Sequence, residues 1–74
     1  MNDAIIKHLT AIVARLVQIY CEVNDCDHIG IQDVTQAAEG LQRMGFDLDS
    51  DTLNSIVSRA VGVLAMNNVV IEFV

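Results

Sequence analysis

The first third of the chain carries a long helical pattern of apolar residues. Over residues 3–23 one row advances by alternating steps of four and three, and a flanking row advances by seven. The rows are Ile5, Leu9, Ile12, Leu16, Ile19 and Val23, and Ile6, Val13 and Tyr20. Together they form a face wider than a two-helix seam, which predicts a central helix that contacts several elements. The same spacing is typical of a coiled coil, so we interpret this face as core first and dimer seam second.

Two further helices are predicted in the second half of the chain. One covers residues 32–44 and ends at Gly45, which is placed for a left-handed cap. The other has Asp49 as its N-cap and runs to residue 66. Their core positions are Val34, Ala37, Ala38, Leu41 and Met44, and Leu53, Ile56, Val57, Ala60, Val61 and Leu64. We also expect Met44 and Met66 to fill the core.

Short extended segments follow the first and the third helix. Residues 29–31 form a brief strand, and residues 69–74 form a β-branched, nearly uncharged one that needs a pairing partner. The prediction is a single domain over residues 1–74, a mostly helical α+β fold in the order helix, strand, helix, helix, strand. This order is similar to that of a winged-helix domain, in which residues 33–66 would be the helix-turn-helix pair and residues 69–74 would open the wing.

Acidic residues dominate the charge and gather in the middle of the chain. Four basic and ten acidic residues give a net charge of −6. The segment from residue 21 to residue 51 carries −7, because eight acidic residues are opposed only by Arg43. They are Glu22, Asp25, Asp27, Asp33, Glu39, Asp47, Asp49 and Asp51. An acidic surface of this kind favours a protein partner with a basic surface, although solubility alone also explains it. Direct nucleic-acid binding is disfavoured, since the basic residues are scattered singly as Lys7, Arg15, Arg43 and Arg59.

Candidate chemistry is sparse. Cys21, Cys26 and His28 supply three potential zinc ligands, but the chain has no second Cys/His pair at the spacing of known zinc sites. We therefore interpret Cys21 as a core residue at a helix end and His28 as solvent-facing. The aspartates fall in turns, where they keep ordinary acidity and make poor general acids. We predict a protein that is not an enzyme and uses no cofactor.

These features predict a small acidic interaction module: an inhibitor, adaptor or assembly factor. One form of this hypothesis is a phage or mobile-element protein that occupies the basic nucleic-acid-binding surface of a host complex. Two alternatives are a dimeric winged-helix-like transcriptional regulator that binds DNA and a structural subunit of a larger assembly. A gel shift on random DNA at low salt separates the regulator from the interaction module.

The surplus of aliphatic residues predicts a homodimer. The interface that we expect is the final strand, because three residues at 29–31 cannot pair with all six residues of that strand. Its residues are Val69, Val70, Ile71, Phe73 and Val74. The broad face of the first helix is the rival seam. Charged residues interrupt the apolar N-terminal segment and no signal-peptide layout is present, so we expect a cytoplasmic protein that does not enter a membrane.

Overall fold

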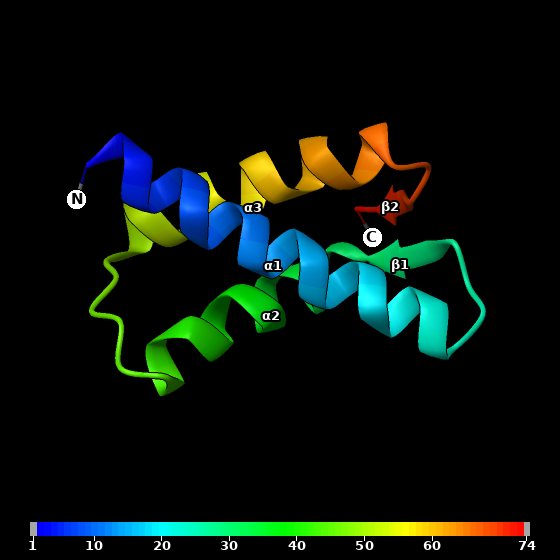
Figure 1. Ribbon diagram of the computed structural model, residues 1–74, viewed down its shortest axis with the longest axis horizontal. Coiled ribbons are helices and arrows are strands. Elements are labelled where there is room, and N and C mark those ends of the chain that lie inside the picture. Colours follow the sequence, from blue (N-terminus) through cyan, green and yellow to red (C-terminus); the bar gives the residue numbers. More distant parts are fainter. Residues whose placement is uncertain (1, 74) are drawn as a thin grey trace.

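The computed structural model describes residues 2–73 and contains three helices and two short strands (Figure 1). In chain order the elements are α1 (Asp3–Val23), β1 (His28–Gly30), α2 (Ile31–Arg43), α3 (Ser50–Met66) and β2 (Val70–Glu72). The predicted α+β fold and the order of its elements are confirmed. The final strand is shorter than predicted, and residue 74 lies outside the described residues.

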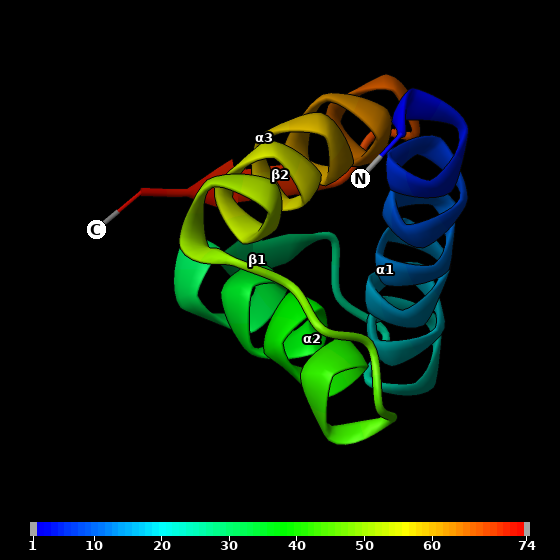
Figure 2. The same ribbon diagram turned by 90° about the vertical axis from the view of Figure 1, so that its left-hand side faces the viewer.

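The helices form two layers. α1 makes one layer, and α2 and α3 lie side by side against one flank of it, so that the opposite flank of α1 is uncovered (Figure 2). The most deeply buried side chains of α2 and α3 meet α1 between the layers. The core consists of Leu9, Val13, Ala14, Val17, Cys21, Ile29, Val34, Ala38, Leu41, Leu48, Ile56, Ala60, Leu64 and Val69. The positions predicted for α3 all face this core, three of them fully buried and three half-buried.

Polar caps fix where the helices begin. The Asn2 side-chain oxygen accepts a hydrogen bond from the backbone N–H of Ile5 (3.0 Å), and the Asp49 carboxylate accepts one from that of Thr52 (2.8 Å). Each cap satisfies one of the backbone donors that a helix start leaves free. The Asp49 cap lies where the sequence predicts it.

Gly45 ends α2. Its φ of 105° is a left-handed conformation that side chains with a Cβ rarely adopt. The chain then turns back, and the backbone N–H of Phe46 donates to the carbonyl oxygen of Leu41 (3.2 Å). This is the 6→1 hydrogen bond of a Schellman motif, as the glycine position predicts.

The two strands form a parallel pair. His28 is opposite Val70, Ile29 opposite Ile71, and Gly30 opposite Glu72. Parallel neighbours require a crossover connection, which α2 and α3 supply together. A wing is an antiparallel hairpin, and β2 instead runs parallel to β1. The similarity to a winged-helix domain is therefore one of element order.

The prediction for the buried face of α1 is wrong for most of its main row. Leu9 is buried, but Ile5, Ile12, Leu16, Ile19 and Val23 are between 41% and 79% exposed. The core side of α1 is instead the arc that contains Leu9, Thr10, Val13, Ala14, Val17 and Cys21. Apolar residues extend around so much of this helix that their spacing does not select the side facing α2 and α3.

The prediction that Met44 and Met66 fill the core is also wrong. Met44 is 62% exposed and Met66 is 85% exposed, so neither fills the core. Met44 is the C-cap of α2 and Met66 is the last residue of α3. At a helix end the neighbouring turn of helix is absent on one side, so an apolar residue can follow the helical spacing without being covered.

Candidate protein-binding surfaces

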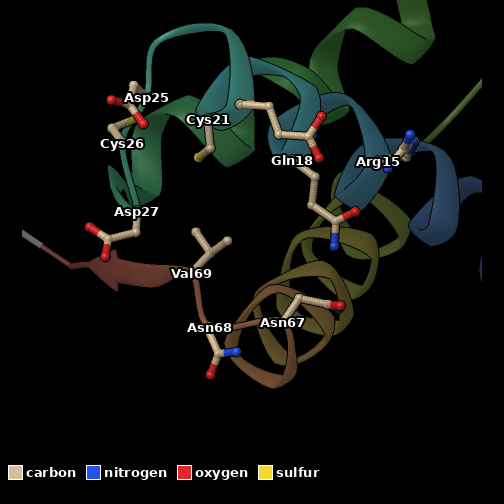
Figure 3. Close-up of a pocket in the computed structure, with 10 residues that line it drawn as sticks. Arg15, Gln18, Cys21, Asp25, Cys26, Asp27, Asn67, Asn68 and Val69 are labelled. Carbon is tan, nitrogen blue, oxygen red and sulfur yellow. The ribbon is translucent and has the colours of Figure 1, made fainter.

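The end of the molecule that carries the strands has an open depression of about 670 Å³ (Figure 3). It lies between the last turn of α1, the segment 24–27 and the turn that joins α3 to β2. Its lining residues are Arg15, Gln18, Cys21, Glu22, Asp25, Cys26, Asp27, Asn67, Asn68 and Val69. Three carboxylates and one guanidinium are among these side chains, so the depression is polar and acidic.

Two similar turns build this depression. After α1, Asp25 adopts a left-handed φ of 51°, and the Cys26 N–H donates to the carbonyl oxygen of Cys21 (3.0 Å). After α3, Asn68 adopts a φ of 66°, and the Val69 N–H donates to the carbonyl oxygen of Leu64 (3.0 Å). Asp and Asn tolerate this conformation better than most residues. Both helix ends are thus closed by the same kind of 6→1 hydrogen bond.

A backbone hydrogen bond ties the two turns to each other. The N–H of Val70 donates to the carbonyl oxygen of Asp27 (2.7 Å), one residue before the paired strands begin. The Asp27 carboxylate lies 2.7 Å from Nδ1 of the exposed His28. Asp27 is therefore held at the rim by its backbone, while its side chain stays accessible to a partner.

The two cysteines lie side by side at the base of this site, yet they differ in environment. Cys21 is buried and Cys26 is exposed. Burial raises the pKa of the Cys21 thiol above its ordinary value, and the adjacent Cys26 thiol and the negative charges of Asp27 and Asp33 raise it further. The predictions of a buried Cys21 and a solvent-facing His28 are confirmed. No three His, Cys, Asp or Glu side chains among residues 2–73 come together in a way that would hold a metal ion.

The eight acidic residues predicted as a binding surface are all exposed, but they do not form one surface. Glu22, Asp25, Asp27 and Asp33 lie at the strand end of the molecule, whereas Asp47, Asp49 and Asp51 lie at the opposite end, around the connection from α2 to α3 (Figure 1). Glu39 lies on the solvent side of α2. The structure therefore brings together one half of the predicted set near the depression.

Some of these carboxylates also have structural roles. Asp49 caps α3, and its hydrogen bonds with Thr52 hold the pKa of the carboxyl below its ordinary value. Asp33 accepts a hydrogen bond from the backbone N–H of Gly30 (3.3 Å) at the start of α2. Glu22, Asp25 and Asp27 are exposed carboxylates of the acidic end, which is the name used below for these three residues.

Only some of the residues predicted as a dimer interface at the final strand are exposed. Val69 is buried in the chain's own core and Ile71 is half-buried, while Val70 and Phe73 are exposed. The strand itself has three residues and is paired along one edge with β1. The predicted position 74 lies outside the described residues. Two exposed apolar side chains at this edge are a smaller surface than the sequence suggests.

The larger exposed apolar surface lies on α1. It consists of Ile5, Ile12, Leu16, Ile19 and Val23, here called the α1 stripe. Two shallow depressions border it. One, of about 370 Å³, is lined by His8, Ala11, Ile12, Arg15 and Leu16. The other, of about 300 Å³, lies between α1 and α2 and is lined by Leu16, Val17, Tyr20, Ile29, Asp33, Gln36 and Ala37. The spacing of this stripe is visible in the sequence, but its exposure is not.

Basic residues do not gather on a common face. Arg59 on α3 forms an ion pair with Asp3 on α1, with Nη2 2.9 Å from the carboxylate oxygen. Lys7 and Arg15 lie on α1 and Arg43 lies at the end of α2. Phosphate binding depends on clustered cations. DNA binding by a dimer stays a prediction from the order of elements.

Among the described helices, α1 is long and apolar enough to cross a membrane. Its mean hydropathy is 1.4 over an 18-residue window, and 33% of that window is buried in the fold. Core helices of soluble proteins and signal sequences have the same length and composition. The predicted cytoplasmic location and the absence of a membrane-bound state therefore stay predictions.

Comparison of the chain with protein-family models, with curated proteins and with solved structures finds no match.

Proposed function

We propose that this chain is a non-enzymatic protein-binding module that docks its acidic end on a basic surface of another protein. The observation that carries the proposal is the gathering of Glu22, Asp25 and Asp27 around one open depression. Carboxylates accept hydrogen bonds and do not donate them at neutral pH, so their natural partners are Lys and Arg side chains.

The neighbouring groups favour the same kind of partner. Asn67 donates one side-chain N–H to the carbonyl oxygen of Val63 (2.8 Å), and its side-chain oxygen is a further acceptor in the lining of the depression. The net charge of −6 adds a long-range attraction that raises the rate of encounter with a basic surface. A nucleic-acid-binding groove has such a surface, and an inhibitor that occupies it, including one encoded by a phage, is the specific form of the proposal.

Charge-neutralising variants test the role of the acidic end. Asp25→Asn/Asp27→Asn removes two charges there, and Asp47→Asn/Asp51→Asn removes the same two charges at the opposite end. The probe is a fluorescent Arg-rich peptide, followed by anisotropy at about 20 mM and about 500 mM salt. We expect the first variant to weaken binding about fivefold more than the second, with the difference reduced at high salt.

Comparing the two double variants distinguishes binding at the acidic end from a general effect of net charge. Equal weakening by the two variants would show that the peptide responds only to net charge, and the acidic end would then have no special role. Asp49 and Asp33 are left unchanged in both variants because they cap helices. A competition assay, in which the chain displaces labelled DNA from a basic DNA-binding protein, tests the inhibitor form of the proposal.

A further inference from the structure

The α1 stripe runs almost the whole length of the molecule. α1 has 21 residues and is therefore about 30 Å long, while the longest dimension of the chain is 33 Å. The exposed fractions of Ile5, Ile12, Leu16 and Ile19 lie between 41% and 44%. α2 and α3 both pack on the other flank of α1, so nothing in the described chain covers this stripe (Figure 2).

We propose that a second copy of this chain covers the stripe, with the two α1 helices packed antiparallel about a twofold axis. From Ile12 to Val23 its positions advance by four, three and four residues, which is the spacing of a helix–helix seam, and Ile5 lies seven residues before Ile12. A twofold interface pairs a surface with itself, so one self-complementary stripe is sufficient to form it. A seam between long helices also covers the exposed flank of α1 without disturbing the core on its other flank.

Charge decides between the antiparallel and the parallel arrangement. The N-terminal half of α1 carries Lys7 and His8, and its one acid, Asp3, is paired with Arg59, while Arg15 lies just past the midpoint of the helix. The last turn of α1 and the segment after it carry the acidic end. Antiparallel packing places the basic half of one helix beside the acidic half of the other, whereas parallel packing places like charges together.

The seam spacing also fixes a register. When Ile12 of one copy lies opposite Leu16 of the other, Ile5 lies opposite Val23, and Ile19 lies opposite Leu9, which the core of its own chain buries. His8, Arg15 and Glu22 form a row with a step of seven beside the stripe. In this register the His8 of each copy faces the Glu22 of the other, and the two Arg15 side chains meet near the axis, where they extend into solvent.

The mass of the full chain in solution tests the interface. Sedimentation equilibrium is measured from about 1 µM to about 500 µM protein for the wild type and for single variants. We expect the wild type to pass from 8.1 kDa to twice that mass. Ile12→Glu and, as an independent position, Ile19→Glu should each raise the dissociation constant by at least about 30-fold, because they bury two carboxylates in an apolar seam. Far-UV circular dichroism checks that both variants stay helical.

Val70→Glu is the matched control, since it introduces the same charge at an apolar residue of β2 that is 48% exposed. It should leave the dimer intact. A wild type that is monomeric at every concentration would overturn the proposal, and so would loss of the dimer in Val70→Glu but not in Ile12→Glu. Pelleting of the wild type with phosphatidylcholine vesicles in place of self-association would assign the stripe to a membrane and would overturn it as well.

A charge swap tests the register. His8→Glu and Glu22→Lys should each weaken the dimer about threefold to tenfold, because each places like or unmatched charges in two symmetric pairs. The double variant His8→Glu/Glu22→Lys should return to within about twofold of the wild type. If the loss of dimerisation free energy in the double variant equals the sum of the losses in the two single variants, the antiparallel register is overturned.

Discussion

Adjacent alanine substitutions in α1 test which side of this helix faces the core. Val13 is fully buried and Ile12 is 41% exposed. Val13→Ala removes two carbons worth about 0.8 kcal/mol each and leaves a cavity that costs about 1 kcal/mol more. Because Ala favours a helix more than Val does by about 0.5 kcal/mol, we expect the free energy of unfolding to fall by about 2 kcal/mol in total. Ile12→Ala removes three carbons that are only partly covered, so the monomer should lose about 1 kcal/mol.

Urea unfolding followed by circular dichroism measures the difference. A chain of this length is stable by about 4–11 kcal/mol, so both variants should fold. With a slope of about 1 kcal/mol per molar urea, the midpoint should fall by about 2 M for Val13→Ala and about 1 M for Ile12→Ala. At high protein concentration the Ile12 variant should lose more, because it would also lose contacts of the dimer that we propose. Equal losses in a dilute sample would refute the assignment of Ile12 to the surface.

Three further predictions address the helix ends and the thiols. Hydrogen bonds from Thr52 lower the pKa of Asp49, so the stability that this cap adds is present above pH 3.8, the ordinary aspartate value, and is lost as the pH falls through the lower pKa of the folded state. The stability of Asp49→Asn should therefore depend less on pH below 3.8, as measured by acid titration followed by circular dichroism. N-ethylmaleimide should modify the exposed Cys26 before the buried Cys21 of raised pKa, as read by mass spectrometry, and the two rates should converge in urea. Gly45→Ala should cost about 1–2 kcal/mol in urea unfolding, since its left-handed φ strains any residue with a Cβ.

Helix ends are the part of this fold that the sequence predicts best, because each depends on a few neighbouring residues. A side-chain oxygen at Asn2 or Asp49 has backbone donors within three residues, and Gly45 needs only its own backbone freedom. The parallel pairing of β1 and β2 could not be predicted in this way. Val70 and His28 are far apart in the sequence, and the direction of β2 depends on how the crossover through α2 and α3 packs.

The acidic surface was overestimated for a related reason. Eight acidic residues within 31 positions suggest one surface, but α2 carries the chain from the strand end to the opposite end of the molecule between Asp33 and Asp47. Charge that is contiguous in the sequence is therefore divided in space. The closeness of Glu22 to Asp27 was predictable, because a turn of a few residues joins them, whereas the contribution of Asn67 and Asn68 to the same depression required the fold.

The width of the apolar arc on α1 connects the failed prediction for this helix with its function. A helix that only completes a core needs one apolar stripe, and α1 has a second stripe on the uncovered flank. The core arc through Val13 and Val17 is already filled by α2 and α3, so the residues of the α1 stripe are only partly covered within one chain. An apolar surface of this length in water favours association, and the seam spacing and the charge gradient of α1 are properties that a second copy matches. The periodicity that led to the wrong buried face is therefore informative, because it has the spacing expected of the interface between chains that we propose.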